Sequence, residues 1–292
     1  MTIAMPLTRN ALLNAGHRYL DALAEGAVAT LEFTSGALLT QNCQPISIAD
    51  GLLGRRCPVR YRYLVADPET QQVAVFAVVE EDEALSVFGS RLAFEGGAIR
   101  EAETLVCRKG ESSVFDPKRL VEPNPLFDAP IAEDERQSRH ELVDYANRYF
   151  DGIELNSAAR VPFHVECNRT ENGVRTTNRA DRPGSMGCAE QFDRGFFGYI
   201  ESMRERRFPI VDTERGLVWG IAFLDVPGTV THLDLRDGRR FELPERMRHP
   251  RSTLLFELFK VAGGQLREIE AFMVNLPYGT TSGWRDVKPS AP

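Results

Sequence analysis

The chain has 292 residues, of which 42% are hydrophobic, and its 35 basic and 42 acidic side chains give a net charge of −7. This balance excludes a general basic field for nucleic acid or an anionic membrane. No stretch approaches the roughly 18 apolar residues of a membrane span, and residues 1–11 lack a signal-peptide pattern. We therefore expect no membrane contact and a cytoplasmic location.

The first half of the chain predicts one helix followed by strands. Leucines recur at helical spacing between residues 12 and 23, and a nearly continuous apolar run at residues 73–79 predicts a buried strand. Gly96-Gly97 suits a hairpin turn, and the residues after it alternate like a strand with one buried face.

Residues 111–135 are the predicted linker, because they contain four prolines and few long apolar runs. Proline fixes φ and removes a backbone donor, so we expect an extended strap over the surface and not a floppy tether. A second irregular stretch, residues 178–187, carries Arg179 and Arg182 and is a candidate pocket lid.

The second half repeats the helix-first order. A capping-box pattern at residues 138–141 opens a predicted helix that presents Tyr145 and Tyr149 on one face, and residues 217–224 predict a buried strand. Tyr149 matches Tyr19 of the first half, which indicates a core role. Ala15 stands opposite Tyr145, so the Tyr145 hydroxyl is specific to the second half.

An internal repeat relates the two halves. Residues 96–103, Gly-Gly-Ala-Ile-Arg-Glu-Ala-Glu, return at 263–270 as Gly-Gly-Gln-Leu-Arg-Glu-Ile-Glu, and two weaker matches precede them in the same order. The offset between matches grows from 130 to 145 to 167 residues, as expected when loops are inserted into an old duplication. We predict a first repeat at 1–110, the linker at 111–135, a second repeat at 136–284 and a tail at 285–292.

Five cysteines without a C-x-x-C motif predict buried free thiols instead of a zinc site or a disulfide framework. Cys167 and Cys188 could pair in an oxidising compartment. No dinucleotide-binding, Walker, G-x-S-x-G or H-E-x-x-H motif is present, so we expect neither an organic cofactor nor a metal.

A longer pattern in the second half resembles a tandem family of bacteria and fungi, largely of unknown function, within the nuclear transport factor 2-like superfamily. That superfamily includes SnoaL-like cyclases, scytalone dehydratase, ketosteroid isomerase and limonene epoxide hydrolase. The resemblance spans about residues 9–283 and implies an α+β fold of two tandem cone-shaped nuclear transport factor 2-like domains, each a helix-covered, strongly bent antiparallel sheet. The fold does not fix the reaction. The pattern comprises Arg148-Tyr149-Phe150-Asp151-Gly152, Cys167-x-Arg169-x-Glu171-Asn172-Gly173, Cys188, Arg206-Arg207-Phe208-Pro209 and Val211-Asp212-x-Glu214-x-Gly216-Leu217.

The second repeat is the predicted site of chemistry. Aligning Thr34 with Thr170 places Ser35-Gly36-Ala37 opposite Glu171-Asn172-Gly173, so the first repeat would have lost this polar trio. The first repeat keeps His17 and other polar residues, which leaves a second working pocket open. Its expected role is structural, in an internal pseudo-dimer; a true homo-oligomer is the alternative.

Polar residues near the predicted apolar strands of the second repeat are of the kinds that move protons or hold an oxyanion. In cones of this superfamily the cavity lies between helix and sheet, and desolvation there moves the pKa of a carboxylate or imidazole toward neutrality. The predicted catalytic residues are His164, Glu171, Tyr145, Tyr149 and Arg169. The predicted substrate-binding residues are His232, Tyr199, Arg182, Phe197 and Trp219.

Several of these candidates have structural explanations as well. His164 alternates with apolar neighbours and suits a hydrogen-bonded structural histidine equally. Arg169 lies two residues before Glu171 on the same strand face, where the two can simply pair. The Asn172-Gly173 dipeptide is a strong hairpin signal, so we assign it to a turn.

The function we predict is a cofactor-independent lyase, dehydratase or isomerase acting on a small apolar, aromatic or polycyclic molecule, in aromatic catabolism or secondary metabolism. Dehydration and carbon–carbon cleavage of lignin-type aromatic dimers are instances by analogy with the fold. The alternatives are a non-catalytic module for ligand binding or assembly, and an epoxide hydrolase. Convergence of three or more polar side chains in one cavity would favour an enzyme.

Overall fold

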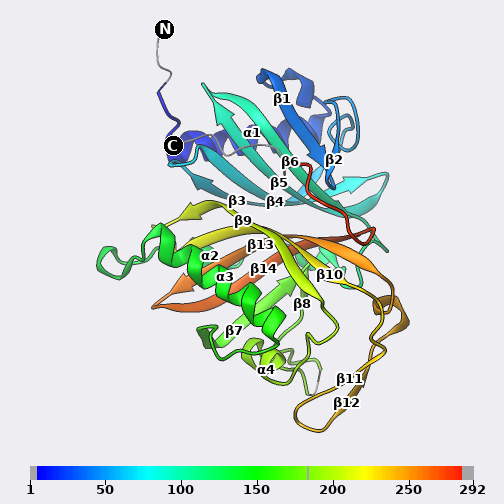
Figure 1. Cartoon of the computed structure of the whole chain (residues 1–292). Coiled ribbons are helices and arrows are strands. Elements are labelled where there is room, and N and C mark those ends of the chain that lie inside the picture. Colours follow the sequence, from blue (N-terminus) through cyan, green and yellow to red (C-terminus); the bar gives the residue numbers. More distant parts are fainter. Residues whose placement is uncertain (1–4, 183, 285–292) are drawn as a thin grey trace.

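The computed structural model describes residues 5–182 and 184–284, so the predicted tail and Pro183 of the predicted lid lie outside the described residues. Two six-stranded sheets lie face to face, and a long helix covers the outer face of each (Figure 1). Two sheets with few helices confirm the mixed α+β class. Within the described part of the chain, no helix combines the length and apolar character needed to cross a bilayer.

The first half begins with a helix whose ends are set by its caps. The Thr8 side chain accepts a hydrogen bond from the backbone N–H of Ala11, and Gly26 ends the helix in the left-handed conformation. The apolar stripe of this helix packs on a sheet of order β2-β1-β6-β5-β4-β3. The elements are α1 (Arg9–Glu25), η1 (Val28–Thr30), β1 (Phe33–Gln41), β2 (Gln44–Pro45), β3 (Val59–Asp67), β4 (Gln72–Glu81), β5 (Ala84–Glu95) and β6 (Ala98–Cys107).

The segment at residues 111–135 is fastened to both halves. The Phe127 ring is fully buried, 5.7 Å from the ring of Tyr63 in the first half. The backbone N–H of Ile131 donates to the carbonyl of Glu214 in the second half. Three short helical turns lie along this strap: η2 (Pro117–Arg119), α2 (Pro125–Asp128) and η3 (Glu133–Glu135).

The second half has the same order of elements, and its sheet order, β8-β7-β14-β13-β10-β9, matches the first. The predicted capping box of its helix is present at Ser138 and Glu141. All five cysteines are free thiols, and Cys167 and Cys188 are not joined. The elements are α3 (Arg139–Leu155), β7 (Phe163–Glu171), β8 (Val174–Arg175), α4 (Cys188–Asp193), β9 (Ser202–Asp212), β10 (Leu217–Val226), β11 (His232–Asp234), β12 (Arg240–Glu242), η4 (Glu245–Met247), β13 (Arg251–Ala262) and β14 (Gln265–Leu276).

Both large sheets are mixed, which corrects the expectation of antiparallel sheets. β1 runs parallel to β6, and β7 runs parallel to β14. Strands joined by a hairpin must be antiparallel, but these partners are remote in sequence and no hairpin sets their direction. The Gly96-Gly97 and Gly263-Gly264 hairpins do follow the prediction, because all four glycines have the positive φ of a type I′ turn.

The alignment of Thr34 with Thr170 is wrong, because the structure places Asn42 where the second half has Asn172. Asn42 bonds both backbone groups of Val106, and Asn172 bonds both backbone groups of Met273, all at 2.8–2.9 Å. The constant offset of 130 residues therefore continues through β1 and β7. The first half also has the Asn turn. In it, Leu39 and Gln41 occupy the positions equivalent to Arg169 and Glu171.

The core between the sheets is rich in aromatic side chains. Trp219 is fully buried there, with its ring 4.8 Å from that of Phe256 and edge-on to Phe76. Two ion pairs flank this core in a reciprocal arrangement, each joining the first residue of one helix to the other half. The pairs are Arg9 with Asp212 and Arg139 with Asp67.

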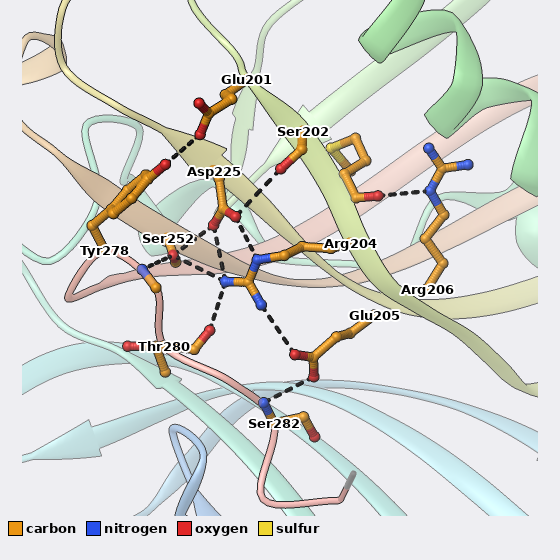
Figure 2. A network of polar contacts seen from close by, with 12 residues as sticks. Glu201, Ser202, Arg204, Glu205, Arg206, Asp225, Ser252, Tyr278, Thr280 and Ser282 are labelled. Atoms are coloured by element: carbon orange, nitrogen blue, oxygen red, sulfur yellow. Dashed lines mark hydrogen bonds and ion pairs between the residues drawn. The ribbon is translucent and has the colours of Figure 1, made fainter.

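The segment after β14 returns from the second half to the first. Arg204 is paired with Asp225 and donates to the carbonyl of Thr280 at 2.6 Å, which holds this segment against β9 (Figure 2). Beyond it, the buried indole N–H of Trp284 donates to Thr40 Oγ1 of the first half at 3.2 Å. Residues 277–284 are thus part of the contact between the halves.

The close approach of the sheets at Gly89 gives a stability prediction. A Cβ at this position would lie 2.8 Å from Cδ2 of the Phe256 ring, which other core side chains hold in place. We expect Gly89→Val to lower the free energy of unfolding by about 1–3 kcal/mol through overpacking. Adding Phe256→Leu should restore part of that loss, as measured by urea denaturation. A double variant less stable than both single variants would contradict this packing.

Candidate functional site

A cavity of about 690 Å³ lies between α3 and the outer face of the second sheet. Tyr149 and Ile153 of α3 line one side, and strands β7, β10, β13 and β14 line the other. Residues 113–116 of the strap and residues from the 178–187 loop also line the cavity, as do residues from the segments 196–199 and 235–247. Part of this enclosure therefore comes from segments outside the sheet and helix.

Strand β13 supplies a row of side chains to the cavity. Its apolar residues Leu254, Phe256 and Leu258 face the core between the sheets, so the alternate residues face the opposite side. Arg251, Thr253, Leu255 and Glu257 all line the cavity. The row thus starts with the guanidinium of Arg251 and ends with the carboxyl group of Glu257. At about 3.3 Å per residue, the Cα atoms of these two residues are roughly 20 Å apart.

Arg169 makes polar contacts with several side chains that line the cavity. Its guanidinium contacts Glu171 Oε1 at 2.8 Å, the Tyr149 hydroxyl at 3.2 Å and Gln191 Oε1 at 2.5 Å. It also lies 5.3 Å from the centre of the Phe197 ring. Burial alone would lower the pKa of Arg169, but the nearby Tyr149 and Glu171 oxygens raise it overall. This residue is a fixed cation.

Glu257 is the titratable group of this site. Burial raises the pKa of its carboxyl group to about 8, opposed by the Arg169 charge and by a hydrogen bond with Tyr149. The register places Glu257 beside Ala271 of β14, which in turn pairs with Glu171 of β7. The two glutamates thus flank a small residue on one face, with Cα atoms roughly 10 Å apart. Burial also raises the pKa of Tyr149, so its hydroxyl remains a hydrogen-bond donor.

The corresponding place in the first half has different chemistry. Leu39 and Gln41 stand for Arg169 and Glu171, and the register gives Ser90 the position of Glu257. Ser90 bonds the Thr104 hydroxyl at 3.2 Å, and the surrounding residues form an apolar core under α1. The cluster of Arg169, Glu171 and Glu257 therefore has no ionisable counterpart at the equivalent positions of the first half.

Six of the ten predicted site residues line the cavity: Tyr149, Arg169, Glu171, Tyr199, Arg182 and Phe197. The first three are in direct contact through the Arg169 guanidinium. Glu171 and Arg169 do pair, as the structural explanation expected, but they do so inside the cavity. The roles assigned to these residues remain predictions.

The structure does not bring the other four predicted residues into the cavity. A register shift between residues 163 and 168 breaks the alternation that predicted an inward His164, whose Nδ1 accepts from the Glu166 N–H. Tyr145 lies one helical turn before Tyr149, with its hydroxyl near the hairpin at Gly264. The remaining two are His232, on the small β11-β12 sheet, and Trp219, in the core between the large sheets.

Sequence reasoning missed Glu257, Gln191 and Arg251. Glu257 carried a visible signal, because it interrupts the apolar run of residues 254–259. Asn172 is structural, as predicted, since its side chain bonds the backbone of the strap and of β14. Among residues 5–182 and 184–284, no group of three or more His, Cys, Asp and Glu side chains is arranged to hold a metal ion.

Comparisons with known proteins place a family match on the half that holds the cavity. Residues 135–273 match a family described as a domain of unknown function (DUF8021). Curated proteins give no match. A solved protein of unknown function with a cystatin-like fold, from Methylobium petroleophilum PM1, is 16% identical with a TM-score of 0.30 over 38% of this chain and 84% of its own. A putative SnoaL-like polyketide cyclase from Jannaschia sp. CCS1 is 16% identical with a TM-score of 0.29 over 47% and 90%.

The Arg169 network predicts strong coupling between two positions. Arg169→Leu leaves buried acceptors without their partner and should lower the free energy of unfolding by about 3–5 kcal/mol. Combining it with Glu171→Gln copies Leu39 and Gln41 of the first half and should recover much of that loss. Urea denaturation of the wild type, both single variants and the double variant gives the coupling energy. Strictly additive losses would show that the pair is not coupled.

Proposed function

We propose that the chain is a cofactor-independent acid/base lyase, dehydratase or isomerase for a small aromatic molecule, built from two nuclear transport factor 2-like domains with the active cone in the second. The observation that carries the proposal is Glu257, a fully buried carboxyl group whose pKa of about 8 lies near neutrality and which lines a cavity with Tyr149, Arg169 and Glu171. A catalytic acid works best when its pKa is close to the working pH.

The two glutamates suit opposite roles. Burial keeps Glu257 largely protonated at neutral pH, so it can give its proton to a departing hydroxyl group, which leaves as water. Glu171, ion-paired with Arg169, can take the proton from the neighbouring substrate carbon. The Tyr149 hydroxyl can donate to an oxygen on which negative charge develops. Arg169 is a positioning residue, because its contacts hold Tyr149 and Glu171.

The aromatic walls indicate the kind of substrate. Phe196, Phe197, Tyr199 and Phe241 line the cavity together with aliphatic side chains. Aromatic rings pack well against such surfaces, edge to face or offset. An aromatic molecule with a hydroxyl β to a ketone would present both a removable proton and a leaving group.

A non-catalytic binding module is the competing function. The contacts of Arg169 described above all end on protein groups, as expected of an internal brace. Turnover decides between the two. We would follow the ultraviolet absorbance of the conjugated enone formed from a panel of aryl β-hydroxyketones.

An active compound in that panel permits a direct test of Glu257. Glu257→Gln should reduce kcat/KM by about 100-fold to 10,000-fold, and the wild-type kcat/KM should fall as pH rises through about 8, because only the protonated acid donates. The exposed Glu166→Gln is the control and should retain activity. Turnover that is unaffected by Glu257→Gln would remove this residue from the mechanism.

A second test of Glu257 needs no substrate. The folded state holds this proton more tightly than the unfolded chain, where a glutamate titrates near 4.5, so its contribution to stability is lost as pH rises from about 4.5 to about 8. The glutamine side chain of Glu257→Gln does not titrate, so the variant does not lose this contribution to stability. The Tm of the variant minus that of the wild type should therefore increase between pH 5 and pH 8, measured by calorimetry. A difference that is constant with pH would contradict the raised pKa.

A further inference from the structure

Charge around the cavity is unbalanced. Arg179 and Arg239 line the cavity, and they are paired with Asp181 and Asp237, respectively. Arg169 is paired with Glu171. Three further arginines line the cavity, and none of them has a carboxylate partner among the described residues. They are Arg182, Arg246 and Arg251.

Arg251 is the buried member of this set. It is only 9% exposed, and burial lowers the pKa of its guanidinium. Its Nη1 donates to the backbone carbonyls of Met247 and His249 at 3.0 and 3.2 Å. Within the described part of the chain, its Nε and Nη2 make no hydrogen bond. A buried cation without a counterion is costly, so an anion is the natural partner for it.

The free edge of Arg251 favours one anion geometry. Nε and Nη2 form the edge of a guanidinium that matches the two oxygens of a carboxylate. Tyr199 also lines the cavity near Arg251, and its hydroxyl makes no hydrogen bond to the described residues. Burial raises the pKa of Tyr199 to about 12, so the hydroxyl remains a donor at neutral pH.

We propose that the cavity takes an aromatic carboxylate, with the carboxylate bound by Arg251 and Tyr199 and the ring lying over Thr253 and Leu255, which face the cavity between Arg251 and Glu257. This deepens the proposed function by naming its substrate class. The exposed Arg182 and Arg246 attract the anion from solution. Arg251 fixes its orientation, so that the aromatic end of the ligand points along β13 toward Glu257.

Binding of matched probes tests the proposal without turnover. We would measure by isothermal titration calorimetry the affinity of the full chain for 2-naphthoate and for its neutral isostere 2-naphthamide. A charge-assisted pair should make the carboxylate bind at least about tenfold more tightly. Equal affinities for the two probes would overturn the proposal, and so would tighter binding of 2-naphthyl phosphate, which would indicate a phosphate site.

A pair of variants locates the effect. Arg251→Met should remove the preference for 2-naphthoate and leave 2-naphthamide binding unchanged. Arg267→Met removes the same charge outside the cavity and should retain the preference. Unchanged preference in Arg251→Met would overturn the assignment. If carboxylates bind but none is turned over in the enone assay, the proposed catalysis is rejected and the carboxylate site stands. If neutral ketones are turned over whether or not Arg251 is present, the carboxylate site is rejected and the proposed catalysis stands.

Discussion

The packing of the two sheets on each other determines where a binding site can form. One face of each sheet is used in the aromatic core between the halves, where Trp219 and Phe256 are buried. Only the outer faces remain, and each is covered by a helix. The reciprocal pairs Arg9–Asp212 and Arg139–Asp67 bind the start of each helix to the opposite half. The space under each helix is therefore fixed by contacts that lie outside it.

The two spaces are used differently. Under α1, Ser90 occupies the position equivalent to Glu257, and apolar side chains fill the core. Under α3 the same framework encloses Arg169, Glu171 and Glu257, three ionisable groups in a setting that disfavours charge. A buried cluster of this kind rarely adds stability beyond what apolar residues would provide.

Much of the fold could be predicted because each half carries clear local patterns for its helix and its hairpins. The helix-first order and the glycine hairpins follow from local patterns that each residue's neighbours determine. The local alignment near Thr34 failed because the register of β1 is set by contacts of Asn42 with β6, more than 60 residues away. Glu257 was missed for the same reason, since its partners come from a helix and another strand. His164 was chosen because it alternates with apolar neighbours, but a register shift in β7 interrupts that alternation.

The fit of Phe256 over Gly89 has a consequence for the history of the interface. The offset of 167 residues makes these two positions equivalent in the two halves. Identical subunits related by a two-fold axis must carry the same residue at equivalent positions, so a phenylalanine there would face another phenylalanine. Joining both halves in one chain lifts that restriction. One half can then carry the large phenylalanine and the other the small glycine. Each half can change at this position without the same change in the other half.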